Sequence, residues 1–384
     1  MIPREAEQEL KSLAAQFKAV AVTGPRQSGK TTLVRMVFPD KPYANLENPN
    51  IRRFAMDDPR GFLSNYQDGA ILDEVQRAPE LFSYLQQVLD EQDGNGRFIL
   101  TGSNNFLLHE NISQSLAGRV GYLFLLPLTL AEINATHNQT DRLLITGGYP
   151  ALYQQNIDPG EYYSNYIRTY IERDVRLLKN IADLYTFERF IRLCAGRTGQ
   201  LLNMSSLASE TGVDVKTISS WISVLEASFI VFRLQPYHEN FNKRIVKMPK
   251  LYFYDTGLAT ALMGVDNITQ LNIHPFRGSL FENLVIGDFL KRLYNKGKSN
   301  NLYFWRDNTG NEIDLLLKSR NRRLPVEIKS GQTVSDDFFK GIRYWNKLTK
   351  MEGGYLVYGG DMIQKRSNAV TVVPLHMVNM IELQ

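Results

Sequence analysis

Length, composition and charge place the chain among globular proteins of two or three domains, since its 384 residues are 43% hydrophobic and 22% charged. No apolar run is long enough to span a bilayer, and the opening MIPREAEQELKSLAAQF is charged and amphipathic rather than a secretory leader. A single cysteine, Cys194, excludes an internal disulfide, and five scattered histidines exclude a zinc-type Cys/His cluster. We therefore expect a cytoplasmic protein without a membrane partner, in which oxygen ligands hold any metal ion.

The two parts of the chain differ in charge. Residues 1–159 contain 14 Lys and Arg against 18 Asp and Glu, whereas residues 160–384 contain 30 against 22. A basic excess indicates where a nucleic-acid surface is to be sought first. The same excess, spread over so many residues, also fits ordinary scatter, so charge alone leaves both interpretations open.

The first elements in chain order alternate between strands and helices. Residues 19–23 (AVAVT) predict a strand, which leads into a glycine-bounded turn and then into helical apolar spacing. Apolar runs at 69–74 and 97–105, separated by a helical stretch, predict two more strands. This alternation favours an α/β fold with a parallel sheet, and a Gly-Gly and Pro break places the end of the first domain near residue 152 (domain 1–152).

The middle part, 153–250, is predominantly helical, with aromatic residues at three- and four-residue spacing. Within it we expect a short helix at 206–210, a turn at Gly212, a helix at 214–227 and then a strand. This is the order of elements in a winged helix, whose second helix would contact DNA. Winged helices also serve as packing modules inside ATPases, so DNA contact is one of two interpretations.

The tail, 251–384, is predicted to form a second α/β domain. Its elements are a helix in RGSLFENLVIGDFLKRL, strands in NLYFWRD, EIDLLLK and LPVEIKS, a helix in DDFFKGIRYWNKL, and a last strand in GGYLVYG. Internal repeats and low-complexity segments are absent from the sequence.

Residues 24–31 (GPRQSGKT) match the phosphate-binding pattern G-x-x-x-x-G-K-[ST]. The glycines let backbone N–H groups close around phosphates, Lys30 reaches the β and γ oxygens, and Thr31 offers its hydroxyl to Mg²⁺. The predicted strand before the loop and helix after it are the context that this motif requires. The residues predicted to bind ATP are Gly24, Pro25, Arg26, Gln27, Ser28, Gly29, Lys30, Thr31 and Thr32.

The segment AILDE supplies the second half of such a site. Asp73 is placed to hold the Mg²⁺ shell together with Thr31, and Glu74 to orient or deprotonate the attacking water. The strand in ILTGSNN ends in small polar residues, so Ser103 or Asn104 is a candidate to sense the γ-phosphate.

Two arginines are candidates for an arginine finger, Arg119 in SLAGR and Arg77 in EVQRAP. Such a finger would reach the nucleotide of a neighbouring copy, so it implies a homo-oligomer, of which a ring is one form. The sequence does not choose between the two arginines, and an ordinary surface role is open for both.

Carboxylates in the tail form a second candidate site. Period-two alternation places Glu327 and Lys329 on one face of a strand, and Asp314 lies on a preceding strand able to pair with it as a hairpin. Together with Glu282 on the helix before them, these carboxylates are candidate ligands for Mg²⁺ that activates water against a phosphodiester. A salt-bridged hairpin in an ordinary α/β domain is the alternative.

The order of these motifs resembles a bacterial and archaeal family of AAA-type P-loop ATPases with a C-terminal domain of unknown function that is itself similar to PD-(D/E)xK nucleases. The segments that carry the resemblance are TGPRQSGKTTL, ILDEVQRAPELFSYLQ, ILTGSNNFLL, SLAGRVGYLFLLPLTLAEI, GGYPALY, YIERDV, KLYFYDTGL, RGSLFENLV, YFWRDNTGNEIDLLL and PVEIKSG. The resemblance implies ATP and Mg²⁺ as cofactors at the first site. It maps the nuclease-like constellation onto Glu282, Asp314, Glu327 and Lys329.

We thus expect an α/β protein with a P-loop AAA-type domain, a helical and winged-helix middle and a nuclease-like tail. The leading functional hypothesis is an ATP-driven or ATP-gated enzyme that processes nucleic acid, with DNA favoured over RNA. A nucleotide-switched protein whose tail docks nucleic acid or protein without cleaving it is the rival. A signalling or stress ATPase without a nucleic-acid role is the third.

Overall fold

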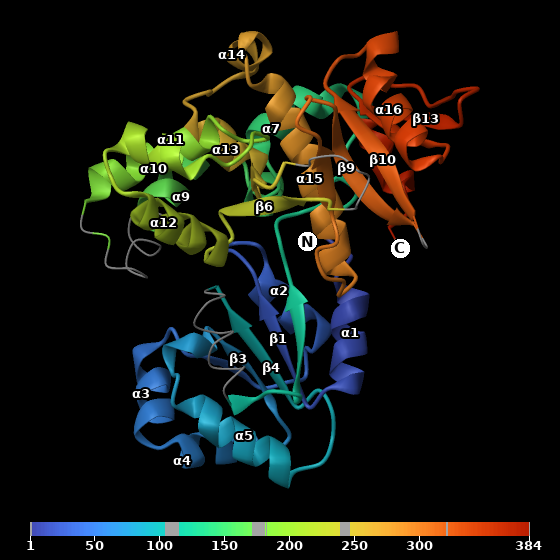
Figure 1. The fold of residues 1–384 in the computed structure, drawn as a ribbon. Coiled ribbons are helices and arrows are strands. Elements are labelled where there is room, and N and C mark those ends of the chain that lie inside the picture. Colours follow the sequence, from blue (N-terminus) through green and yellow to red (C-terminus); the bar gives the residue numbers. More distant parts are fainter. Residues whose placement is uncertain are drawn as a thin grey trace. The chain divides into compact units, whose positions relative to one another are not determined.

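The computed structural model describes residues 2–103, 115–170, 181, 183–238, 246–319 and 322–383 (Figure 1). These residues form two compact units. The first contains residues 1–127, 227–229 and 293–299, and the second contains 128–226, 230–292 and 300–384. Within the described ranges, no helix is long and apolar enough to cross a membrane. The second unit holds most of the predicted middle part and of the predicted tail. The three-part division, with its boundaries after residues 152 and 250, stays a prediction.

The first unit is built on a parallel sheet. Its five strands, in spatial order, are β2 (Tyr43–Asn45), β3 (Ala70–Asp73), β4 (Phe98–Gly102), β1 (Ala19–Thr23) and β5 (Val120–Phe124). All four pairings between neighbours are parallel. The carboxyl ends of the strands therefore share one edge, where open α/β sheets place their ligands.

Helices cover both faces of this sheet. Successive residues of β1 alternate between the two cores, because side chains of a strand point to opposite faces: Ala19 and Ala21 lie in one, Val20 and Val22 in the other. The alanine face packs against α3 (Pro49–Asp57), α4 (Pro59–Ser64) and α5 (Leu81–Glu91), which Figure 1 shows grouped on one side. The valine face packs against α1 (Glu7–Gln16) and α2 (Lys30–Val37).

The second unit begins with a helical part. Its helices are α7 (Thr140–Thr146), α8 (Ala151–Gln154), α9 (Pro159–Tyr166), α10 (Leu184–Ala195), α11 (Met204–Thr211), α12 (Val215–Ala227), α13 (Thr256–Leu262) and α14 (Ile268–Ile273). The buried carboxylate of Asp255 joins them, since it accepts hydrogen bonds from the Tyr163 hydroxyl at 2.6 Å and from the Gly148 N–H at 2.7 Å. A Cβ at residue 147 would lie 2.3 Å from the same carboxylate, so this close approach requires Gly147.

The helix pair α11–α12 occurs where the sequence predicts a helix, a turn and a helix. Gly212 ends α11 in the left-handed region, with φ of 78°. Asp214 precedes α12 and accepts hydrogen bonds from the N–H groups of Lys216 and Thr217 and from the Thr217 hydroxyl. Thr217 therefore helps to cap the helix, whereas Lys216 is exposed. The assignment as a winged helix stays a prediction.

A mixed sheet forms the rest of the second unit. Its spatial order is β12 (Gln364–Lys365), β13 (Val370–Pro374), β11 (Gly354–Tyr358), β10 (Arg322–Lys329), β9 (Glu312–Ser319), β8 (Tyr303–Arg306), β6 (Val231–Pro236) and β7 (Lys250–Phe253). The predicted hairpin is confirmed, because β9 and β10 pair antiparallel with Val326 opposite Leu315. The prediction that β11 is the last strand is wrong, because β13 follows and pairs with it in parallel.

Two helices accompany this sheet in the second unit. Ile342 and Trp345 of α16 (Lys340–Thr349) pack into two apolar clusters with residues of the strands. The long α15 (Arg277–Asn295) contacts β7, because the Asn283 amide pairs with the backbone N–H and C=O of Phe253 at 2.7 and 2.8 Å. The neighbouring Glu282 thereby faces the same strand. Strand β6, which the sequence assigns to the middle part, thus shares one sheet with the strands of the predicted tail, and β7 crosses the predicted boundary after residue 250.

Candidate functional site

The predicted phosphate-binding loop follows β1 at the carboxyl edge of the first sheet. Gly29, directly before α2, has φ of 92°, a backbone conformation that favours glycine. A side chain at Gly24 would come within 2.1 Å of a backbone carbonyl oxygen, that of Leu125. Gln27 also has positive φ, at 63°. The loop is therefore held in a conformation that two glycines at this spacing permit.

Lys30 is buried at the first residue of α2. Its ammonium group donates to the carbonyl oxygens of Gly24 at 3.0 Å and Pro25 at 2.8 Å, so it lies inside the loop. Burial lowers the pKa of Lys30 to about 8, although the carboxylates of Glu74 and Asp73 oppose this shift. The group is thus positioned for a negatively charged ligand whose charge would restore the usual pKa.

Asp73 ends β3 and is surrounded by hydroxyl groups. Thr31 donates to both of its carboxylate oxygens, at 3.1 and 3.0 Å, and Tyr43 donates at 2.6 Å. The Thr101 hydroxyl donates to it as well. Burial and the hydrogen bond to Asp73 raise the pKa of Tyr43, so this phenol stays a donor. Sequence reasoning missed Tyr43, which begins β2, and Thr101, which is the next-to-last residue of β4; these two strands flank β3.

Glu74 follows Asp73 with a left-handed backbone, φ 53°, which costs a residue with a Cβ on the order of 1 kcal/mol. Its carboxylate accepts hydrogen bonds from the Ser103 hydroxyl at 3.1 Å and from the Gln76 amide. Because β4 lies between β1 and β3, Ser103 at the end of β4 stands between the loop and the acidic pair. Asn104, the alternative candidate for sensing the γ-phosphate, lies outside the described residues.

The residues around the loop fit a nucleotide with Mg²⁺. Thr31 and Asp73 present a hydroxyl and a carboxylate within hydrogen-bond distance, which are the oxygen ligands that Mg²⁺ prefers. The Ser28 hydroxyl is buried and has no hydrogen-bond partner among the residues that the structure describes. The carbonyl of Ser28 is fixed by Arg4, which donates to it at 2.7 Å. Thr32 is exposed on α2.

The two arginines proposed as fingers lie at opposite edges of the first sheet. Arg77 is ion-paired with Glu47 at 3.0 Å, and Arg26 of the loop approaches the same carboxylate at 3.8 Å. Arg119 directly precedes β5, at the amino edge of the sheet, and forms two hydrogen bonds with Asp90. Arg119 is therefore remote from the loop of its own sheet, whereas Arg77 lies near it.

In the second unit, Asp314, Glu327 and Lys329 come together on the β9–β10 hairpin. The Lys329 ammonium contacts Asp314 at 3.0 Å and Glu327 at 2.7 Å. Asp314 also accepts from the Ile328 N–H at 2.8 Å. Burial and then the neighbouring Asp314 raise the pKa of Glu327 well above its usual range.

Glu282 faces this hairpin but is paired with different groups. Lys250 contacts Glu282 at 2.9 Å and Glu312 at 2.5 Å, and Tyr252 donates to Glu282 at 2.5 Å. No group of three or more His, Cys, Asp or Glu side chains in the described part of the chain is arranged to hold a metal ion. Sequence reasoning missed Lys250 and Tyr252, which lie two residues apart on β7 and therefore point to the same face of the sheet.

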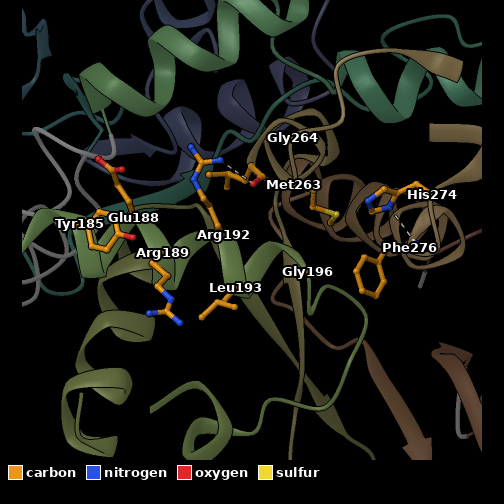
Figure 2. A pocket seen from close by; sticks show the side chains of 11 residues that line it. Tyr185, Glu188, Arg189, Arg192, Leu193, Gly196, Met263, Gly264, His274 and Phe276 are labelled. Atoms are coloured by element: carbon orange, nitrogen blue, oxygen red, sulfur yellow. Dashed lines mark hydrogen bonds between the residues drawn. The ribbon is translucent and has the colours of Figure 1, made fainter. Parts of the chain in front are cut away.

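A surface cavity of about 580 Å³ lies elsewhere in the second unit (Figure 2). Side chains of α10 line one side of it, and Met263, His274 and Phe276 line another. The guanidinium group of Arg192 donates a hydrogen bond to the carbonyl oxygen of Leu262 at 3.4 Å. None of the site residues predicted from the sequence lines this cavity.

Comparison with known proteins places the chain in a family. A model described as an AAA domain matches residues 16–134, and two models described as domains of unknown function, DUF8612 and DUF4143, match 137–269 and 277–378. The uncharacterized protein Rv2008c of Mycobacterium tuberculosis is 31% identical over 379 residues, which cover 98% of this chain and 84% of that protein. The chain belongs to the family of this mycobacterial protein. Its first unit is accordingly a P-loop ATPase domain of the AAA type, as the sequence predicts.

More distant relatives and solved structures share parts of the chain. The uncharacterized protein MJ1544 of Methanocaldococcus jannaschii is 21% identical over 351 residues, covering 82% of this chain and 75% of that protein. The Walker-type ATPase PABY2304 of Pyrococcus abyssi has 15% identity and a TM-score of 0.46, over 68% of this chain and 96% of that one. AMPPCP-bound DnaA from Aquifex aeolicus has 14% identity and a TM-score of 0.30, over 58% and 85%.

Proposed function

We propose that this ATPase requires Mg²⁺ and uses ATP hydrolysis to drive or gate the processing of nucleic acid, DNA rather than RNA. The observation that carries the catalytic part is the gathering of Lys30, Thr31, Asp73 and Glu74 at one edge of the first sheet. A bound Mg²⁺ would draw charge from the β and γ phosphates during transfer.

Each of these residues has a separate task. Lys30 binds the terminal phosphates with its ammonium group, and Thr31 and Asp73 would hold the metal ion. Glu74 orients the attacking water or accepts its proton, and Ser103 holds the Glu74 carboxylate in place. Arg119, at the opposite edge of the sheet, serves a neighbouring copy, so the active form is a homo-oligomer.

Support for a nucleic-acid partner comes from the second part of the chain. Residues 160–384 carry 30 Lys and Arg against 22 Asp and Glu, and Lys216 is exposed at the start of α12. A positively charged surface attracts nucleic acid through its phosphates. The tail would then contact the bound strand.

A second candidate function has an observation in its favour. In this alternative the tail docks DNA or a protein partner in response to the nucleotide state and cleaves nothing. On the β9–β10 hairpin, Lys329 is ion-paired with both Asp314 and Glu327, so these two carboxylates already have a cationic partner. This pairing favours a binding role for the tail over hydrolysis of a phosphodiester.

The test of the proposed function is an ATPase assay with and without single-stranded DNA, double-stranded DNA and RNA. We expect hydrolysis to need Mg²⁺ and to be stimulated by DNA more than by RNA. Glu74→Gln serves as the control for contaminating activity, because it should bind ATP without turning it over. A hydrolysis rate that stays the same with each of the three nucleic acids would exclude nucleic acid as the partner. The switch alternative would then remain, and a pull-down with the purified chain in different nucleotide states tests it.

A further inference from the structure

Four carboxylates and two lysines form a buried charged centre in the second unit. It draws on three strands and one helix, and its members are Lys250 on β7, Glu312 and Asp314 on β9, Glu327 and Lys329 on β10, and Glu282 on α15. Every carboxylate of the centre contacts one of the two ammonium groups within 3.0 Å. The centre therefore consists of two ion-paired groups, one around Lys250 and one around Lys329, rather than an open cluster of acids.

Lys250 is the buried cation of the first of these two groups. Only 3% of the residue is exposed, and its ammonium group contacts Glu282 at 2.9 Å and Glu312 at 2.5 Å. Burial by itself would lower the pKa of Lys250, but the carboxylates, Glu282 first among them, outweigh burial and raise this pKa well above the usual value. Lys250 thus carries a permanent positive charge at the place where the acids face one another.

The distances suit an ammonium group and not a divalent cation. An ammonium group donates hydrogen bonds to carboxylate oxygens at N···O distances near 2.8 Å, whereas Mg²⁺ requires oxygens at about 2.1 Å and in octahedral arrangement. Tyr252 donates to the same oxygen of Glu282 as Lys250 does, so this oxygen is already shared by two donors. In the described part of the chain, no three acidic side chains are arranged to hold a metal ion.

We propose that Lys250 is the resident cation of this centre and that Glu282, Glu312, Asp314 and Glu327 hold no divalent metal. Lys250 pairs with Glu282 and Glu312, Lys329 pairs with Asp314 and Glu327, and Arg306 pairs with Glu312 as well. No metal-bound water is then available to attack a phosphodiester, and the second unit acts by binding. This proposal is opposed to the metal set Glu282, Asp314 and Glu327 that the sequence suggests, and it does not depend on ATP hydrolysis in the first unit.

A fixed internal cation has a physical advantage in this position. Carboxylates buried without a counter-charge are strongly destabilising, and a metal ion that exchanges with solvent would leave them unpaired for part of the time. Lys250 is attached to β7, so its charge is always present. The side chain therefore joins β7 to α15 and β9 under all metal concentrations.

The test measures Mn²⁺ binding by isothermal titration calorimetry, without nucleotide, in the full chain carrying Asp73→Asn. Asp73→Asn removes the carboxylate of the candidate metal site in the first unit. Any heat of Mn²⁺ binding that remains therefore reports on the second unit. In this background we expect no saturable Mn²⁺ binding at millimolar concentration. Addition of Asp314→Asn should change nothing, because Asp314 holds no metal.

Removing the internal cation should create a metal site. We expect Lys250→Met to bind one Mn²⁺ at least about tenfold more tightly than its parent, because Glu282 loses its ion-pair partner and Glu312 keeps only the partly exposed Arg306. Its melting temperature should fall without Mn²⁺ and recover when Mn²⁺ is added. The matched control is Arg306→Gln, since Arg306 also pairs with Glu312, at 3.1 Å, but is itself partly exposed and leaves Lys250 in place.

One result would overturn the proposal directly: saturable Mn²⁺ binding by the protein with Lys250 intact that Asp314→Asn abolishes. This measurement does not require Lys250→Met to fold, so the proposal stays testable if that variant is too unstable. A folded Lys250→Met that gains no Mn²⁺ site would also count against it. A failure of the proposed ATPase function is seen in nucleotide turnover instead, and the two outcomes are therefore separate.

Discussion

The pKa of Lys30 predicts how nucleotide binding depends on pH. Burial lowers this pKa to about 8 in the nucleotide-free protein, so the ammonium group loses its proton between neutral and mildly alkaline pH. A nucleotide that binds the charged form must then take up a proton from solvent. Between neutral pH and about pH 9 the affinity should fall about tenfold, or about 1.4 kcal/mol. A lysine with the ordinary pKa of 10.5 would produce almost no change over this range.

The assay is a titration with a non-hydrolysable ATP analogue at several pH values, followed by calorimetry. The terminal phosphate, with a second pKa of about 6, stays ionised throughout the alkaline range and does not contribute. Lys30→Arg is the matched control, because guanidinium keeps its charge and should give weaker but pH-independent binding. Repetition in two buffers of different ionisation enthalpy reports the proton uptake directly. Affinity that stays constant up to about pH 9, without proton uptake, would refute the reasoning.

Three further predictions concern turnover, assembly and stability. Glu74→Gln should keep ATP affinity and lose about a hundredfold or more in turnover, measured as steady-state phosphate release; unchanged turnover would remove Glu74 from the mechanism. Specific activity should rise with protein concentration, and Arg119→Ala should abolish that rise; full activity at every dilution would contradict a role in a neighbouring copy. Asp255→Asn should lower the free energy of unfolding in urea by about 3 kcal/mol, because an amide cannot accept from Tyr163 and Gly148 together as the carboxylate does; a change below about 1 kcal/mol would exclude this role.

In the first unit, most of the candidate site could be predicted because the motif is local. The loop and the start of α2 are consecutive residues, so glycine spacing and the lysine specify them without long-range information. The hydroxyl groups around Asp73 were not predicted. Tyr43 and Thr101 reach that carboxylate only because β2 and β4 flank β3, and strand order is set by packing between residues far apart in the sequence.

In the second unit, alternation correctly placed Glu327 and Lys329 on one face and paired their strand with that of Asp314. Alternation did not reveal that Lys250 is the cation that pairs with Glu282 and Glu312. Lys250 is the last residue of the predicted middle part, and it reaches Glu282 only because β7, which begins at Lys250, joins the edge of the sheet. Strand β13 was not predicted, because its valine-rich run is only five residues long, follows a polar segment and ends in proline.

The sequence by itself determined the elements whose signals lie within one segment: the phosphate-binding loop, the acidic pair that ends β3, the helix pair α11–α12 and the β9–β10 hairpin. The tertiary structure alone decided which groups from separate segments meet, namely the hydroxyls at Asp73, Arg119 with Asp90, and Lys250 with Glu282 and Glu312. Local signals arise from backbone geometry and spacing, which a short window contains. The balance of buried charge depends on sheet order and burial, which no short window contains.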